Sequence, residues 1–367
     1  MKTLRPAVRI GVVVHGPEVI DSGAAVTTLD RLSAFGEVRA VLGGTMGKVA
    51  VIDWGLEDRI DISKRMVPSR SLIDLQVDSD ILILLNQAKN RETALVFGSM
   101  IAARASLYRP LIQVDWGGRL IACLVGEETQ LAQSLATDLG LDLLASPTFS
   151  GQTVDVGGRQ TRKVVGVVPG ECLTLDGIVI GRVTGDEVEV AVAGGRIIEL
   201  KGALPKVHGM EKLSDVDLRL AILRSGNIRR TNAPSRRLDP GRVGEPEGHI
   251  VIIDHAAEGA FESAKGASVV VTVGDDTTYI TGEILGRLGI PLIGIVDGDR
   301  DCLCSQTCMP PGSTIVRVRQ GMDDQIGKKI REHLAAGGSR SICQTRAVVR
   351  SEVIRLAGED LLWAKDV

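Results

Sequence analysis

Residues 268–301 constrain the fold more than any other part of the sequence, because their order of apolar and turn residues fits one supersecondary unit. The stretch begins with a β-branched run at residues 269–273, which is typical of a strand buried on both faces. A turn rich in Asp and Thr follows, and then apolar residues recur with helical spacing up to Gly289. A second apolar run at residues 291–296 completes a predicted β-α-β unit.

Both predicted strands of this unit end in acidic turns. Asp275 and Asp276 follow the first strand, and Asp297, Asp299 and Asp301 follow the second. Because open α/β sheets bind ligands outside the carboxyl ends of their strands, we expect these five carboxylates to meet at a ligand-binding edge. A cation would relieve their repulsion, and Mg²⁺ prefers oxygen ligands. The alternative is that the first pair only caps a helix and the second segment only forms a glycine turn.

Each residue of this edge has a predicted role. The candidate metal ligands are Asp275, Asp276 and Asp301. The candidate cofactor-binding residues of the turn are Gly274, Thr277 and Thr278. Their backbone N–H groups and hydroxyls lie at the start of the predicted helix, where they could bind the phosphates of a cofactor. The candidate catalytic residues are Asp297 and Asp299.

The two acidic turns also resemble, over about 35 residues, a pattern of ATP-dependent phosphofructokinases and NAD kinases. The shared features are a strand, a Gly-Asp turn, a helix and a strand that leads to a second acidic turn. The resemblance implies that Asp276 is the metal-associated aspartate and that Asp297 or Asp299 is the base. The turn of this chain lacks the second and last glycines of those families, and the remaining sequence follows neither of them.

Three cysteines, Cys302, Cys304 and Cys308, directly follow the second acidic turn. A short loop of this kind can point several sulfurs at one metal, with Cys343 or His255 as a fourth ligand, and the metal would be zinc or an Fe–S cluster. The spacing differs from the Cys-x-x-Cys pairs of common zinc sites. The alternative interpretation is a set of reduced thiols without a shared ligand.

Strand and helix patterns alternate through the first 148 residues, which predicts a parallel sheet with helices on both faces. The four predicted strands span residues 8–14, 38–42, 80–85 and 111–114. A glycine-rich turn after the second strand contains Gly43, Gly44 and Lys48. It is not a Walker A loop, but its N–H groups and its cation could bind a phosphate or carboxylate of a cofactor. An ordinary tight turn explains the same residues equally well.

The remaining chain divides into three predicted regions. Residues 149–212 show short alternating strands between glycine turns, which is typical of a small β-rich domain. Residues 213–248 are predicted as a helix, at residues 215–223, followed by an arginine-rich linker or lid. Arg229 and Arg230 of this segment either lie in solvent or bind an anionic cofactor or substrate. Residues 249–367 are predicted as a second α/β domain, closed by a C-terminal helix at residues 346–356.

Composition excludes several classes of protein. The net charge of −3 gives no reason to expect binding to nucleic acid or to an anionic membrane, and 2% aromatic residues disfavour a base-stacking surface. No apolar run reaches the ~18 residues that a membrane helix needs. Six cysteines without a signal-peptide cleavage pattern predict thiols or metal ligands in a cytoplasmic protein.

Several motifs spread along the chain are similar to those of an uncharacterised archaeal family that is best represented in methanogens. They are VVVHGPEVIDSG at residues 12–23, GGTMG at 43–47, KVHGMEKL at 206–213, GDDTT at 274–278 and DGDRD at 297–301. The resemblance covers most of the chain, implies a cytoplasmic archaeal protein, and carries no activity.

These observations together predict an α/β protein with two Rossmann-like parallel-sheet domains and a small β-rich domain between them. The predicted function is a Mg²⁺-dependent enzyme that acts on a nucleotide or phosphorylated small molecule, by phosphoryl transfer. The alternative function is a non-catalytic metal-binding or redox-sensing protein that uses the loop at residues 302–308.

Overall fold

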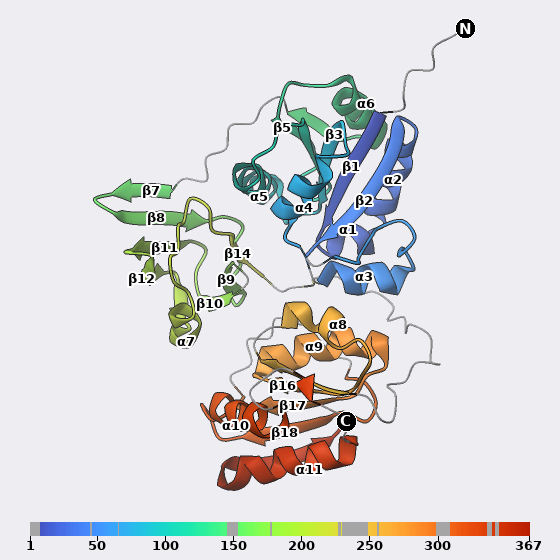
Figure 1. The fold of residues 1–367 in the computed structure, drawn as a ribbon. Helices are drawn as coiled ribbons and strands as arrows, with labels where there is room; N and C mark the ends of the chain where they lie inside the picture. The colour runs from blue at the N-terminus through green and yellow to red at the C-terminus, as the bar shows by residue number, and fades with distance from the viewer. Residues whose placement is uncertain are drawn as a thin grey trace. The chain divides into compact units, whose positions relative to one another are not determined.

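The computed structural model describes residues 8–44, 46–64, 66–144, 153–176, 178–226, 229, 249–254, 257–298, 309–335, 340–341 and 345–367. The chain forms two compact units, residues 1–232 and 233–367 (Figure 1). It is a mixed α/β protein, and its described residues form four sheets. Within the described ranges, no helix has both the length and the apolar character to cross a membrane.

The first unit contains a six-stranded sheet in the order β2-β1-β3-β4-β5-β6. Its strands are β1 (Val8–His15), β2 (Gly36–Gly43), β3 (Ile81–Asn86), β4 (Leu111–Asp115), β5 (Leu120–Val125) and β6 (Asp142–Leu144). All neighbouring pairs are parallel except β4 and β5. Its helices are α1 (Glu18–Asp21), α2 (Ala24–Ser33), α3 (Met46–Trp54), α4 (Pro68–Leu75), α5 (Arg91–Arg104) and α6 (Gln130–Leu139). The chain leaves β1 for β2 on one side and returns to β3 on the other, so the strand order reverses at β1.

The middle of β1 is buried on both faces, as its run of valines predicts. Val12 and Val14 pack in a core shared with α2 and α6, whereas Val13 packs in a second core shared with α4 and α5. Each of these valines is 0% exposed. Helices therefore cover both faces of the sheet, and its polar side chains gather at the strand ends.

Two four-stranded sheets, in the orders β13-β10-β9-β14 and β12-β11-β8-β7, form the rest of the first unit. The strands are β7 (Thr153–Val156), β8 (Arg159–Val164), β9 (Cys172–Leu175), β10 (Ile178–Val183), β11 (Val188–Ala193), β12 (Arg196–Lys201), β13 (Ala203–Pro205) and β14 (Leu223–Ser225), with helix α7 (Val207–Glu211). Their pairing is antiparallel, and both sheets contribute to one core that includes Leu173, Ile180 and Val190. The predicted β-rich character of this part is confirmed.

The helix predicted at residues 215–223 is wrong. These residues form turns that lead into β14, which pairs with β9. The reason is that side chains satisfy the backbone groups a helix would have used. The Arg162 guanidinium donates to the carbonyls of Leu218 and Ala221, each at 2.9 Å, and Gln160 Oε1 accepts from Leu218 N–H at 2.7 Å. Such side-chain bonds compete with a helix for the same groups.

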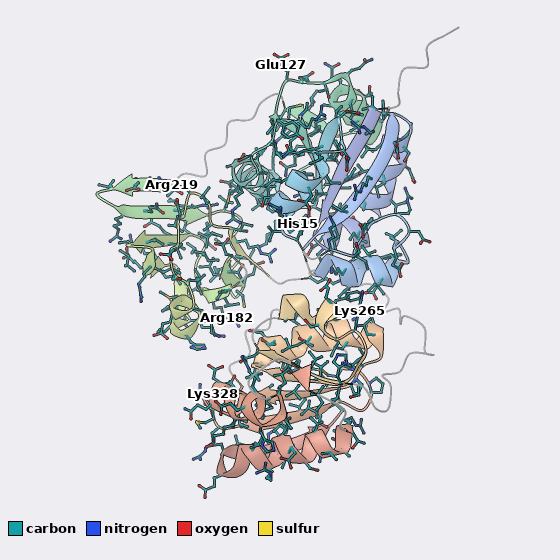
Figure 2. The ribbon with its side chains drawn as sticks, viewed as in Figure 1. His15, Glu127, Arg182, Arg219, Lys265 and Lys328 are labelled. Atoms are coloured by element: carbon teal, nitrogen blue, oxygen red, sulfur yellow. The ribbon has the colours of Figure 1, made fainter. Side chains whose placement is uncertain are left out.

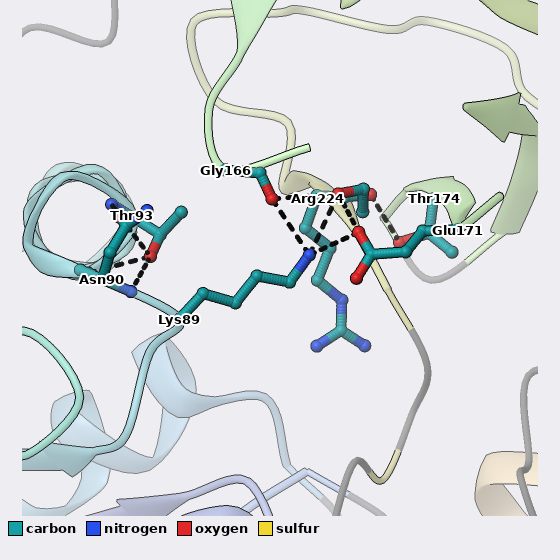
Figure 3. Close-up of polar contacts among 8 residues, drawn as sticks. Lys89, Asn90, Thr93, Gly166, Glu171, Thr174 and Arg224 are labelled. Atoms are coloured by element: carbon teal, nitrogen blue, oxygen red, sulfur yellow. Dashed lines mark hydrogen bonds and ion pairs between the residues drawn. The ribbon is translucent and has the colours of Figure 1, made fainter. Parts of the chain in front are cut away.

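The β-rich part is fixed to the six-stranded sheet along α5 (Figure 3). Lys89, in the loop before this helix, donates to Glu171 at 2.5 Å, to Gly166 O at 3.0 Å and to Ser225 Oγ at 3.1 Å. At the other end of α5, Arg104 donates to Leu220 O and pairs with Asp176 at 2.8 Å. These contacts join the two parts of the first unit and place β14 beside the loop that follows β3.

Replacing Lys89 by methionine is expected to lower the free energy of unfolding of the first unit by about 2 kcal/mol, because Glu171 would lose its charged donor in a setting where both side chains are largely buried. Urea denaturation of the variant measures this loss. Lys163→Met is the matched control, since Lys163 and its partner Glu187 are both exposed. Equal stability of the two variants would mean that the Lys89 contacts do not hold the β-rich part in place.

The second unit contains a six-stranded sheet in the order β19-β15-β16-β17-β18-β20. Its strands are β15 (His249–Asp254), β16 (Ala267–Val273), β17 (Leu292–Val296), β18 (Thr314–Val318), β19 (Arg340–Ser341) and β20 (Leu361–Asp366). The four strands from β15 to β18 are parallel, and β19 and β20 are antiparallel to their neighbours. The helical segments are η2 (Ala257–Gly259), α8 (Ala260–Ser263), α9 (Asp275–Leu288), α10 (Asp323–Ala335), α11 (Arg346–Ala357) and η3 (Gly358–Asp360).

The predicted β-α-β unit is confirmed as β16, α9 and β17. One face of the sheet packs against α10 and α11, in a core that includes Val316, Ile326 and Val349. The helix predicted at residues 346–356 is confirmed as α11, but it does not end the chain, because β20 follows it and pairs with β18. β20 begins with four apolar residues that do not alternate with polar ones, and four of its six residues are exposed, so it lacks the pattern of a half-buried strand.

Candidate functional site

The two predicted acidic turns of the second unit meet at the carboxyl end of its sheet. Asp275 begins α9 after β16, and its Oδ2 accepts hydrogen bonds from the N–H groups of Asp297 and Gly298, both at 2.9 Å. Asp275 and Asp297 are each 4% exposed. The carboxylate of the first turn therefore lies directly against the backbone of the second, as the parallel arrangement of β16 and β17 requires.

A third strand end joins the same edge. Asp297 Oδ2 accepts a hydrogen bond from Gly321 N–H at 2.6 Å, and Gly321 lies between β18 and α10. Two carboxylates thus fix the loops that follow β16, β17 and β18. Asp276, in the first turn of α9, is partly exposed and lies at the same edge.

The residues predicted to hold a cofactor at this turn differ in their surroundings. Gly274 has a φ of 96°, a backbone conformation that favours glycine, and it precedes α9. Thr277 is 7% exposed. Thr278 is fully buried, its hydroxyl bonds that of Thr272 at 2.8 Å, and a Cβ at Gly294 would overlap its side chain. Thr278 therefore fastens α9 to the sheet, and its contact with a cofactor stays a prediction.

Arg317 is a residue of this edge that the sequence did not predict. It lies in β18 opposite Val296, the residue before the second acidic turn. A Cβ added to Gly298 would overlap the Arg317 guanidinium, so the guanidinium lies against this turn. The side chain is partly buried, and it forms no hydrogen bond or ion pair with the described residues. The edge therefore combines carboxylates with an arginine that makes no hydrogen bond to the described side chains around it.

The carboxylate at the end of the neighbouring strand β15 is paired with an arginine of a helix. Asp254 ends β15 and forms an ion pair with Arg331 of α10. This contact neutralises the carboxylate at the end of the strand next to β16, so the acidic character of the edge is concentrated at β16 and β17.

Several predicted residues lie outside the described residues. They are Arg230, His255, Asp299, Asp301, Cys302, Cys304, Cys308 and Cys343. Among the residues that the structure does describe, no group of three or more His, Cys, Asp or Glu side chains has an arrangement that could hold a metal ion. Metal binding by the acidic edge or by the cysteine loop, and redox sensing by that loop, therefore stay predictions.

The predicted binding residues of the first unit lie near the carboxyl end of its sheet. Gly43 ends β2, Gly44 follows with a φ of 106°, and Lys48 lies in α3 with only 3% of its surface exposed. Arg229 donates to both oxygens of Asp21, at 2.9 and 2.7 Å, and to Asp53 at 2.9 Å.

Arg229 is thus engaged by acidic side chains of its own unit. Its side chain is 11% exposed, and those of Asp21 and Asp53 are 2% and 0% exposed. A contact between Arg229 and an anionic substrate would require these bonds to open, and that contact stays a prediction.

The fold and the acidic edge define a mixed α/β protein in which one of several open sheets carries converging carboxylates at its strand ends. The chain belongs to the archaeal family described as "uncharacterized protein conserved in archaea" (DUF2117), whose model matches residues 12–338. An uncharacterized protein of Methanocaldococcus jannaschii is 40% identical to it over 339 residues, which cover 89% of this chain and 91% of that protein. No solved structure matches the chain. The predicted archaeal family is therefore confirmed.

Proposed function

We propose that the carboxyl edge of the second sheet binds Mg²⁺ together with the phosphate groups of a nucleotide or phosphorylated small molecule, and that the protein is an enzyme of phosphoryl transfer. The observation that supports this function is the meeting of both acidic turns at Asp275, with the Arg317 guanidinium seated on the second turn. We also propose that each six-stranded sheet belongs to a Rossmann-like domain. We place the end of the β-rich domain between them after β14 and not at residue 212, and the pairing of β14 with β9 supports this boundary.

Each component of the edge suits one part of such a ligand. Carboxylate oxygens coordinate Mg²⁺, which usually also retains water and phosphate oxygens. The N-terminus of the 14-residue helix α9 provides backbone N–H groups for a phosphate. Arginine binds phosphate oxygens through two parallel N–H groups, which Arg317 can supply. Asp276 is the preferred metal ligand among the described acids, because Asp275 and Asp297 already hold the loops together.

Calorimetric titration with ATP, GTP, CTP, UTP and pyrophosphate, each with and without Mg²⁺, tests this function. At least one of these ligands should bind, and only when Mg²⁺ is present. Arg317→Gln should weaken that binding by about tenfold to a hundredfold, the effect of losing a hydrogen bond between charged groups. Asp276→Asn should remove the response to Mg²⁺ while leaving the loop contacts of Asp275 in place.

Arg319→Gln is the matched control, because Arg319 lies just after the same strand but pairs with Asp360. It should bind the ligand as the wild type does. Silent titrations for every ligand with Mg²⁺ would overturn the proposed function. Equal weakening by the two arginine substitutions would show that the effect is one of overall charge.

A further inference from the structure

The first unit has a histidine at the point where ligands bind to sheets of this kind. His15 ends β1, next to Gly43 at the end of β2 and Asn86 at the end of β3 (Figure 2). The strand order reverses at β1, and open α/β sheets bind ligands outside the carboxyl ends of the strands at such a reversal.

The contacts of His15 define the state of its ring. Nδ1 lies 2.8 Å from Gly43 O. Since a carbonyl oxygen only accepts, Nδ1 carries the hydrogen and Nε2 carries a lone pair. The ring stacks on Phe97, with centroids 4.7 Å apart and planes 20° apart. His15 is partly exposed, and its Nε2 accepts no hydrogen bond from the described residues.

The imidazole is neutral at physiological pH. Burial lowers the pKa of His15 to about 4, the Arg224 charge lowers it further, and the bond to Gly43 opposes both. Among the described residues, Arg224 from β14 is the charged group that acts on the ring, and the Glu18 carboxylate of α1 lies against Gly16, the next residue in the chain. A neutral ring with a lone pair on Nε2 is an acceptor for a hydroxyl or an N–H group.

Arg224 lies near His15 because Lys89 holds Ser225, the residue next to Arg224 in β14, in place. Lys89 binds Ser225 Oγ, and Thr174 Oγ1 donates to Arg224 O at 3.3 Å. Figure 3 shows the Arg224 guanidinium pointing away from the Lys89 contacts. The docking of the β-rich part on α5 thus brings a cation from one part of the unit to the histidine of the other.

We propose that His15 and Arg224 form a binding site for a small anionic hydroxy compound. His15 Nε2 accepts the hydrogen bond of the ligand's hydroxyl, and the Arg224 guanidinium binds its carboxylate or phosphate. This site belongs to the first unit and the Mg²⁺–phosphate site to the second, so a test of one site does not depend on the other.

Carbethoxylation of histidine by diethyl pyrocarbonate, followed by peptide mass spectrometry, tests the site. The lone pair of an unprotonated imidazole attacks a carbonyl carbon of the reagent, and a protonated imidazole does not react. At pH 5.5, which lies above the pKa of about 4 of His15, this histidine should therefore still react. Glycerol 3-phosphate, D-glycerate and glycerol are then added in turn. One of the two anions should slow the reaction of His15 by a factor of 1 + [L]/Kd, about tenfold at ten times Kd, and glycerol should not.

The two anions distinguish a phosphate ligand from a carboxylate ligand. In Arg224→Gln, His15 should still react, but neither anion should protect it. Arg219→Gln is the matched control, because Arg219 is exposed and pairs with Asp217, and it should retain the protection. A His15 that does not react at pH 5.5, reaction rates that neither anion changes, or protection that survives in Arg224→Gln would each overturn the proposal. Thermal melts of both variants confirm that they are folded.

Discussion

Replacing Arg229 by methionine is expected to lower the free energy of unfolding of the first unit by about 3–5 kcal/mol, the range for removing one partner of a buried ion pair. The guanidinium contributes three hydrogen bonds to two carboxylates that are almost completely buried. In the variant, Asp21 and Asp53 keep their burial and lose this cation.

Urea denaturation followed by tryptophan fluorescence measures the loss, because two of the three tryptophans, Trp54 and Trp116, lie in the first unit. Trp54 Nε1 donates to Asp21 at 3.0 Å and so lies at this cluster. Arg59→Gln is the control. Arg59 also pairs with an aspartate, Asp30, but in solvent, where such a pair contributes up to about 1 kcal/mol. If Arg229→Met costs no more than Arg59→Gln, the pairs made by Arg229 do not stabilise the unit.

A triple variant distinguishes lost charge compensation from lost packing. Arg229→Met combined with Asp21→Asn and Asp53→Asn removes the buried charges together, and it should recover much of the stability that the single substitution loses. A triple variant no more stable than Arg229→Met would show that the contacts of the arginine, and not its charge, carry the effect.

The strands that were predicted well from the sequence are buried strands made of short runs of apolar residues. The run at residues 8–14 lies within β1, and residues 269–273 lie within β16. β5, β19 and β20 were missed for other reasons. β19 has only two residues, too few for a periodic pattern, and β20 is mostly exposed and does not alternate apolar with polar residues. The buried strand β5 pairs antiparallel to β4 after a short turn, outside the expected alternation of strands and helices.

The candidate site shows the same division between local and long-range information. The convergence of the two acidic turns follows from one β-α-β unit, because β16 and β17 are parallel neighbours. Arg317 lies in a different strand, and its place beside Gly298 depends on the register that pairs it with Val296. No local pattern specifies that register. His15 likewise depends on Arg224 from the β-rich part, which only the docking on α5 brings near.

The stability of the first unit is expected to fall by about 3 kcal/mol as the pH decreases from 6.5 to 4, through His15 alone. In the unfolded chain, the pKa of a histidine is about 6.5. In the folded protein, burial and the Arg224 charge lower the pKa of His15 to about 4, against the opposing bond to Gly43. Between these values the unfolded chain binds a proton that the folded protein does not, so stability falls with decreasing pH by about 1.4 kcal/mol per unit.

The difference between the wild type and His15→Asn isolates this contribution, because acidic groups that titrate in the same window affect both proteins alike. Urea denaturation at pH 7.5, 6.5, 5.5 and 4.5 should give curves of stability against pH that converge toward the acidic end. Asparagine removes the titrating ring but retains an N–H donor for Gly43. His333→Asn is the control, since His333 is exposed in the second unit, and it should leave the pH dependence of the first unit unchanged. Parallel curves for the wild type and His15→Asn would mean that the His15 ring takes up a proton in the folded state as readily as in the unfolded chain. His15 could not then remain a hydrogen-bond acceptor at the pH of 5.5 used to test the site it forms with Arg224.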